Sequence, residues 1–299
     1  MKTKSFLIAI SLAVLFTACT PGATPTLAPT ATPFPYFGQS LADVTYCTMD
    51  GLPQKLDIYF PSSGGPWPVA IHVHGWAWMK GDKSEAVGLG TALNTEGYVV
   101  AAVNYRLYPQ AHFPDFIEDV KCAVRFLRAH AADYNLDPER FAAIGASAGG
   151  HLVALLGTSD QSAGFDVGEY LNQSSRVQAV IDISGPSDLS QDFKNNDLAA
   201  LMLVAFGSDQ LAAASPVTHI TSDDPPFLIL HGDNDGVVEV VHAYILNDAL
   251  VAAGVPVKLV IVNNGDHSLN APDGSATATQ EEIWQMELDF LEANLKPGK

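Results

Sequence analysis

The feature that most constrains the fold of this chain is a serine in a glycine-rich turn between an apolar strand and an apolar helix. Residues 141–144 form an apolar run of strand length, and residues 152–156 form an apolar run that suits a helix. Between them, residues 145–149 read Gly-Ala-Ser-Ala-Gly, with Ser147 at the centre. The glycines leave room for a strained turn, and the helix start points its backbone N–H groups toward the serine. This context predicts a nucleophilic serine, although the motif alone also suits a tight connection without chemistry.

Two later strands end in residues that would complete a catalytic triad. The apolar strand 226–232 leads into an acidic loop at residues 233–235, and the strand 257–262 leads to His267. Side chains just past the carboxyl ends of parallel strands meet at one edge of a sheet. The order serine, acid, histidine is that of a hydrolase with this type of turn. We therefore expect Ser147 to attack a carbonyl carbon, with His267 as general base and then general acid.

Strand and helix patterns alternate without a break, which predicts one α/β domain with a mostly parallel sheet and helices on both faces. The chain has 299 residues, of which 47% are hydrophobic, so it can bury a full core. Residues 184–224 lack a clear strand and predict short helices that form a small cap. Strands are expected at residues 44–49, 54–60, 69–74, 98–105, 141–144, 177–183, 226–232 and 257–262, and helices at 84–97, 114–133, 152–156, 238–253 and 278–295.

The charge of the chain excludes several classes of function. Fifteen Lys and Arg residues against 33 Asp and Glu residues give a formal net charge of −18. Such a surface repels nucleic acid, and no basic stripe offsets it. The sequence has neither a phosphate-binding glycine-rich loop nor a cysteine and histidine cluster with metal-ligand spacing. We expect no nucleic-acid partner, no cofactor and no metal, and the oligomeric state is not predicted.

The N-terminus predicts export. Residues 1–4 are basic, and residues 6–16 are apolar but too short to span a membrane. The apolar stretch ends in Phe16-Thr-Ala-Cys19, which resembles the lipidation box of a bacterial lipoprotein, although Phe16 stands where leucine is usual. An ordinary secretory signal cut near Ala18 is the alternative.

These features divide the chain into three parts. Residues 1–18 are expected to be a lipoprotein-type signal peptide, and residues 19–36, rich in Thr and Pro, an extended tether. Residues 37–299 form the expected catalytic domain. A lipid on Cys19 would hold this domain at the cell envelope, and the lipid would be its only membrane contact. If the alternative signal applies, the protein is secreted.

Short motifs spread from residue 46 to the C-terminus carry a family resemblance. They include Leu56-Asp-Ile-Tyr-Phe-Pro61, His72-Val-His-Gly75, Asn104-Tyr-Arg-Leu107, Gly145-Ala-Ser-Ala-Gly-Gly-His151 and His231-Gly-Asp-Asn-Asp235. Together they resemble the α/β-hydrolase esterases near the hormone-sensitive-lipase and bifunctional acetylxylan/feruloyl esterase groups. The resemblance implies an α/β-hydrolase fold and a serine carboxylesterase acting on short-acyl or aryl esters. Acetyl or feruloyl groups on polysaccharide are among the implied substrates, and the exact ester is not implied.

The resemblance also selects the catalytic acid. In the family pattern the aspartate stands four residues after the strand-end histidine, here His231, and this selects Asp235. Asp233 is the alternative. Asp266 adjoins His267 in the chain, which makes a hydrogen bond between the two side chains awkward, so it is expected to be a loop residue. His231 is expected to brace its loop.

The oxyanion loop departs from the family pattern. Many relatives read His-Gly-Gly-Gly, whereas this chain continues after Gly75 with Trp76 and Ala77. The backbone N–H groups of Ala148 and Trp76, with Gly75 as a further donor, are the expected oxyanion hole. An indole of Trp76 turned into the site would limit the acyl chain to acetyl through butyryl. Four aromatic residues are candidates for the substrate pocket, with core packing as the alternative for each: Trp76, Trp78, Tyr105 and Tyr108.

Two questions stay open at the level of sequence. Cys47 and Cys122 either pair in a disulfide, as exported proteins permit, or lie separately buried as free thiols. The esterase interpretation also has two competitors, a prolyl-oligopeptidase-like serine peptidase and a non-catalytic binding protein of the same fold. A triad that has kept all its members favours an enzyme over a binding protein.

Overall fold

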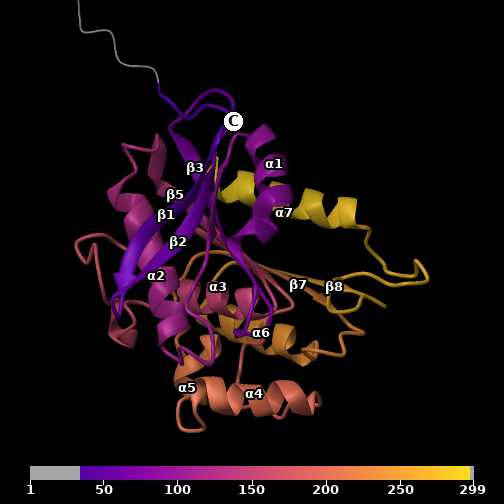
Figure 1. The fold of residues 1–299 in the computed structure, drawn as a ribbon. Helices are drawn as coiled ribbons and strands as arrows, with labels where there is room; N and C mark the ends of the chain where they lie inside the picture. Colours follow the sequence, from indigo (N-terminus) through magenta and orange to yellow (C-terminus); the bar gives the residue numbers. More distant parts are fainter. Residues whose placement is uncertain (1–33, 297–299) are drawn as a thin grey trace, which may run out of the picture. The chain divides into compact units, whose positions relative to one another are not determined.

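The computed structural model describes residues 34–296, in which eight strands form one sheet with helices on both faces (Figure 1). The strands are β1 (Ser40–Met49), β2 (Leu52–Tyr59), β3 (Trp67–Val73), β4 (Val99–Val103), β5 (Leu136–Ala146), β6 (Ala179–Ile183), β7 (Phe227–Gly232) and β8 (Val257–Val262). The helices are α1 (Val87–Thr95), α2 (Asp115–Ala129), α3 (Ala148–Thr158), α4 (Asn196–Phe206), α5 (Leu211–Ala214), α6 (Val241–Ala253) and α7 (Gln280–Leu295), with short 3₁₀ turns η1 (Lys83–Ala86), η2 (Gln161–Ala163) and η3 (Pro216–Thr218). The predicted mostly parallel α/β architecture is confirmed. The predicted signal peptide, Cys19 and most of the tether lie outside the described residues.

The order of the sheet brings the predicted catalytic strands together. The strand order is β1-β2-β4-β3-β5-β6-β7-β8, with antiparallel pairing only at β1–β2 and β2–β4 among the described strands. Val73 of β3 pairs with Gly145 of β5, and Gly232 of β7 pairs with Val262 of β8. The carboxyl ends of these strands therefore reach the same edge, where open α/β sheets place their binding sites.

Alternating side chains divide the core into two layers, as the two-residue period of a strand requires. On one face, Ala142 and Ile144 of β5 belong to a cluster that also contains Leu93 of α1 and Leu291 of α7. The side chains that alternate with these along the strands face α2, α3 and α6. Gly157 of α3, for example, lies so close to Val180 and Phe227 that there is no room for a Cβ. Figure 1 shows α1 and α7 lying together on one side of the sheet.

The buried face of α7 carries one acidic side chain, Glu287. Glu287 is 8% exposed, and burial raises the pKa of its carboxyl from 4.5 to about 7. Since the folded-state pKa lies above the unfolded value, the contribution of Glu287 to the free energy of unfolding is most favourable below pH 4.5 and falls as the pH rises through 7. A shift of this size corresponds to about 3 kcal/mol.

We therefore expect Glu287→Gln to raise the free energy of unfolding at pH 8 by up to about 3 kcal/mol and to change it little at pH 4. Urea denaturation of both proteins at the two pH values is the measurement. An equal gain at both pH values would show that the difference in unfolding free energy between the two proteins comes from packing and not from ionisation.

Most predicted boundaries differ from the structure by a few residues, and those of β5 and α2 are examples. β5 begins at Leu136 and not at residue 141, because Leu136 pairs with Trp67. The intervening residues 137–140 form an irregularity within the strand. α2 ends at Ala129 and not at residue 133, since the chain turns there to enter β5.

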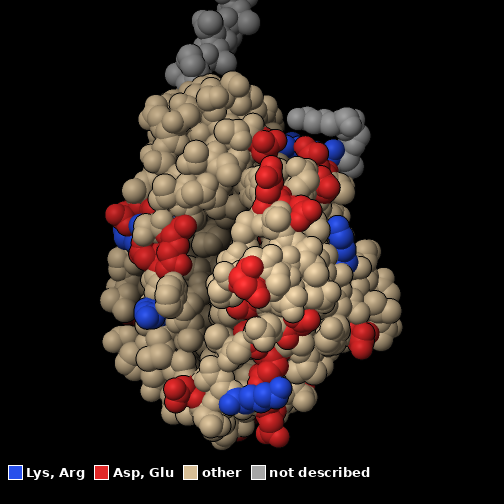
Figure 2. All heavy atoms as spheres, turned by 90° about the vertical axis from the view of Figure 1, so that its right-hand side faces the viewer, with Lys and Arg blue, Asp and Glu red and all other residues tan. Residues whose placement is uncertain are grey.

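The segment between β6 and β7 forms short helices, as predicted for the cap. Ala214 of α5 accepts a hydrogen bond from Nε2 of His151 at 2.8 Å, and Phe206 of α4 packs on Phe116. These contacts fix the cap to α2 and α3. None of the described helices has the length and apolar character to cross a membrane. On the face shown in Figure 2, acidic side chains outnumber basic ones, in agreement with the net charge of the chain.

Candidate active site

The predicted nucleophile lies in a strained turn between β5 and α3. Ser147 has φ +57° and ψ −121°, and its backbone N–H donates to the carbonyl of Ile183 at 2.8 Å. A Cβ at Gly145 would lie 2.4 Å from the backbone of Gly149, and a Cβ at Gly149 would lie 2.1 Å from the carbonyl oxygen of Val73. Only glycine fits at both positions, which explains the motif on either side of the serine. Ser147 itself is partly exposed.

The predicted base and acid lie in direct contact. Nδ1 of His267 is 2.7 Å from Oδ2 of Asp235, whose side chain is fully buried, while the His267 side chain is 24% exposed. A carboxylate only accepts, so Nδ1 carries the proton and Nε2 is the basic nitrogen. Oδ1 of Asp235 accepts from the backbone N–H groups of Val237 and Val238 at 2.8 and 3.0 Å. The carboxylate therefore cannot rotate freely, and it fixes the orientation of the imidazole.

Hydrogen bonds keep this acid ionised. Burial alone raises the pKa of the Asp235 carboxyl, but the bonds from His231 and His267, together with the backbone donors, outweigh burial and leave the pKa well below its usual range. A permanent negative charge at this position would stabilise an imidazolium formed at His267 by uptake of a proton.

The two other aspartates near His267 hold loops. Asp233 is exposed, and its Oδ1 accepts from the backbone N–H of Asn264 at 2.6 Å. Oδ1 of Asp266 accepts from the backbone N–H groups of Ser268 and Asn270. Neither carboxylate is hydrogen-bonded to His267 within the described residues.

His231 has a contact that the sequence did not reveal. Its Nε2 lies 2.9 Å from the carbonyl oxygen of Val238, which fits the expected loop brace, and also 3.3 Å from Oδ2 of Asp235. Because a carbonyl only accepts, Nε2 carries the proton and is shared between the two oxygens. The four-residue spacing between His231 and Asp235 is the sequence signal for this contact.

The oxyanion loop lies beside the nucleophile. A Cβ at Gly75 would lie 3.5 Å from Cβ of Ser147. Within residues 34–296, the backbone N–H groups of Trp76 and Ala148 donate to no other protein group, so both are free for a ligand. Behind the loop, the hydroxyl of Tyr105 donates to the carbonyl of His74 at 3.2 Å, and the two rings stack at 4.4 Å.

Comparison with known proteins agrees with this geometry, in which a serine stands in a tight turn beside free N–H groups and a histidine is bonded to a buried carboxylate. Residues 56–250 match the BD-FAE family. The chain belongs to the BD-FAE family. The chain is 36% identical over 189 residues to the probable carboxylic ester hydrolase LipM of Mycobacterium tuberculosis, covering 60% of this chain and 44% of that protein. The chain spans about half the length of the curated relatives it matches.

Solved structures extend the likeness to nearly the whole domain. A truncated carbohydrate esterase from gut microbiota has a TM-score of 0.73 and 28% identity, covering 87% of this chain and 98% of that one. Esterase 2 of Thermogutta terrifontis, phosphonylated by sarin, has a TM-score of 0.76 and 25% identity, covering 89% and 99%. With the sheet order and helix layers, this confirms the α/β-hydrolase fold.

The aromatic residues proposed for the pocket of this BD-FAE member lie in different environments. Trp78 and Tyr105 are 1% and 3% exposed. With so little exposed surface, neither side chain can contact a ligand. Both therefore pack in the core, which was the alternative to a role in the pocket. Tyr108 is partly buried, edge-on to His112. Trp76 is 55% exposed with Nζ of Lys80 over its ring at 4.4 Å, so its indole does not line a closed acyl pocket.

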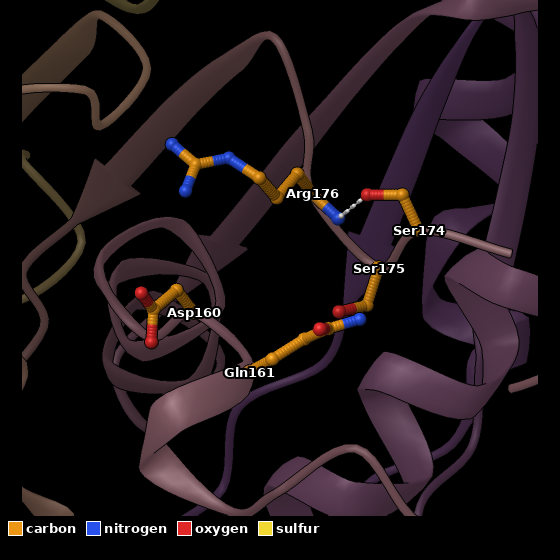
Figure 3. Close-up of a pocket in the computed structure, with 5 residues that line it drawn as sticks. All are labelled: Asp160, Gln161, Ser174, Ser175 and Arg176. Atoms are coloured by element: carbon orange, nitrogen blue, oxygen red, sulfur yellow. Dashed lines mark hydrogen bonds between the residues drawn. The ribbon is translucent and has the colours of Figure 1, made fainter.

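A separate surface hollow lies at the other end of α3. Asp160, Gln161, Ser174, Ser175 and Arg176 line it, and the backbone N–H of Arg176 donates to Oγ of Ser174 (Figure 3). α3 has 11 residues, so this hollow is separated from the nucleophile by about 16 Å of helix. None of the predicted catalytic residues lines this hollow. The described residues also contain no group of three or more His, Cys, Asp or Glu arranged to hold a metal ion.

Proposed function

We propose that the protein is a serine carboxylic-ester hydrolase that acts on short-acyl or aryl esters, with acetyl or feruloyl groups on polysaccharide as its natural substrates. The observation that carries the proposal is the 2.7 Å hydrogen bond from His267 to the buried Asp235, at the strand edge where Ser147 stands. Curated relatives named as esterases and a carbohydrate esterase of the same fold support the reaction and the substrate class.

The geometry suggests how the residues divide the reaction. Nε2 of His267 takes the proton from Oγ of Ser147 as the oxygen forms a bond to the ester carbon. The N–H groups of Trp76 and Ala148 would hold the resulting oxyanion. When the tetrahedral intermediate collapses, the bond to the alcohol breaks and the alcohol leaves with the proton from Nε2. Water then attacks the acyl-enzyme by the same route and releases the acid.

We further propose that the protein is exported, with a lipid on Cys19 and the tether at residues 19–36 holding the domain at the cell envelope. The lipidation box in the sequence supports this location. A disulfide between Cys47 and Cys122 also supports it, because such bonds persist mainly outside the reducing cytoplasm.

Covalent labelling tests the proposed reaction. The protein should hydrolyse p-nitrophenyl acetate and lose this activity on treatment with paraoxon, with one phosphoryl group on the peptide that contains Ser147. Ser147→Ala should take up no label. A label on another residue, or hydrolysis that survives full labelling of Ser147, would exclude it as the nucleophile. Cleavage of peptide substrates in preference to esters would favour the peptidase alternative.

A further inference from the structure

Three consecutive residues of the oxyanion loop adopt a backbone conformation that favours glycine. φ is +68° at Trp76, +51° at Ala77 and +57° at Trp78. A side chain with a Cβ atom is disfavoured in this left-handed region, and bulky residues are found there only when other interactions or a function retain them. Each tryptophan in this loop therefore needs a compensating interaction or a function.

Burial compensates Trp78. It is 1% exposed and packs edge-on against Phe206 at 4.8 Å and against His151 at 5.3 Å. An indole buried in this way contributes more to stability than its backbone conformation costs.

Burial does not compensate Trp76. Its side chain is 55% exposed, and its one ring contact among the described residues is with Lys80, whose Nζ lies 4.4 Å from the ring centroid. An exposed contact between a cation and a ring is weak. Glycine at this position would remove the backbone cost, and more than half of the indole surface lost with it faces solvent. Folding therefore gives no reason for a tryptophan here, which points to a role in binding.

The position of Trp76 indicates what it would bind. It follows Gly75, the residue that lies against Ser147, so it stands at the rim of the site. An ester carried by a polysaccharide can send only its acyl group toward the serine, because the polymer is too large to enter. The part of the substrate that meets an exposed side chain at the rim is therefore the sugar.

We propose that the Trp76 indole is a stacking platform for the sugar ring that carries the ester, an inference that rests on the proposed esterase function. The C–H groups on the face of a pyranose carry partial positive charge, which suits the negative face of an aromatic ring. Lys80 covers one face of the indole, and the other face is the side for the sugar. The ammonium group can also donate hydrogen bonds to sugar hydroxyls. This assigns Trp76 to the alcohol side of the ester and not to the acyl pocket.

Two acetate esters that differ only in their alcohol test whether Trp76 contacts the alcohol side of the substrate or the acyl side. Trp76→Ala should lower kcat/KM for an acetylated xylo-oligosaccharide by about 10-fold, mainly through KM, because a stacked ring is lost. The same variant should lower kcat/KM for ethyl acetate by a clearly smaller factor, since that alcohol has no ring to stack, so the ratio of the two kcat/KM values falls. Trp76→Phe should restore most of the activity on the sugar ester. Titration calorimetry with unesterified xylotetraose should show weaker binding to Trp76→Ala by the same factor.

Leu171→Ala is the matched control, because Leu171 is 56% exposed and lies in the loop between η2 and β6, which contains none of the proposed site residues. It should change none of these values. Equal losses of Trp76→Ala on both esters would instead show that Trp76 shapes the oxyanion loop, and a gain confined to longer acyl chains would make it an acyl wall; either result overturns the proposal. Unchanged xylotetraose binding also overturns it. If the protein hydrolyses neither ester and Trp76→Ala still weakens xylotetraose binding, the platform stands and the esterase function fails.

Discussion

Replacement of Ser147 or His267 by alanine should lower kcat for p-nitrophenyl acetate by roughly 10⁴- to 10⁶-fold, because the triad residues act as a unit. Both side chains are partly exposed, so their removal creates no large cavity and the thermal midpoint should change little. The double variant should be no slower than the slower single variant by more than a few-fold. If the losses in kcat of the two single variants multiplied in the double variant, the two residues would not act in the same step.

The identity of the acid is the sharper part of this prediction. Asp235→Asn should lower kcat by about 10⁴-fold, since an amide would face Nδ1 of His267 with a donor and force the wrong tautomer. Asp233→Asn is the matched control, because an asparagine can still accept from the N–H of Asn264. That variant should keep its activity within a few-fold. If Asp233→Asn were the inactive one, the geometry around His267 would have to change during catalysis.

Much of the candidate site could be predicted from sequence because each proposed catalytic residue follows a strand whose type and end are set by local pattern. Apolar runs of strand length placed β5, β7 and β8, and the elements after them placed Ser147, Asp235 and His267 at one edge. The choice between Asp233 and Asp235 came from a family spacing. The structure gives a physical reason for that choice, since Asp235 is buried and bonded to His267 while Asp233 is exposed.

What could not be predicted depends on contacts between distant segments. Trp76 and Trp78 are two residues apart and have nearly the same φ, yet one is exposed and the other buried. The difference arises because Phe206, from the cap, covers Trp78. No local pattern encodes such a contact, so the sequence predicts the same two alternatives, pocket or core packing, for both residues.

Charged residues inside α2 show the same limit. Helical periodicity predicts which positions of α2 are apolar, but Lys121 and Arg125 are also buried, at 1% and 0% exposed. Both pair with Asp166, at 3.1 and 2.6 Å, in the loop that follows η2. Burying a cation is costly unless it is paired, and the partner comes from a segment without a recognisable pattern. That loop also lies next to the disulfide, since a Cβ at Gly168 would lie 3.6 Å from Sγ of Cys122.

The disulfide itself leads to a large expected effect on stability. Cys47 of β1 and Cys122 of α2 are buried and bonded, which resolves the alternative that the sequence had left open. The bond joins residues 75 positions apart. Closing a loop of this length restricts the unfolded chain and contributes about 4 kcal/mol in the chain-entropy view.

We therefore expect the double variant Cys47→Ala, Cys122→Ala to lose about 4 kcal/mol of unfolding free energy in urea. Part of any loss comes from the removed sulfur atoms and not from the bond, so the comparison needs a second arm. Native protein unfolded with a reductant present should lose a similar amount, while the variant should be indifferent to the reductant. Two free thiols in the native domain, counted in denaturant without reductant, would mean that the bond does not form in solution. If the reductant lowered the stability of both proteins equally, that loss would not come from breaking this disulfide. A loss of stability in the native protein alone ties the effect of the reductant to this bond.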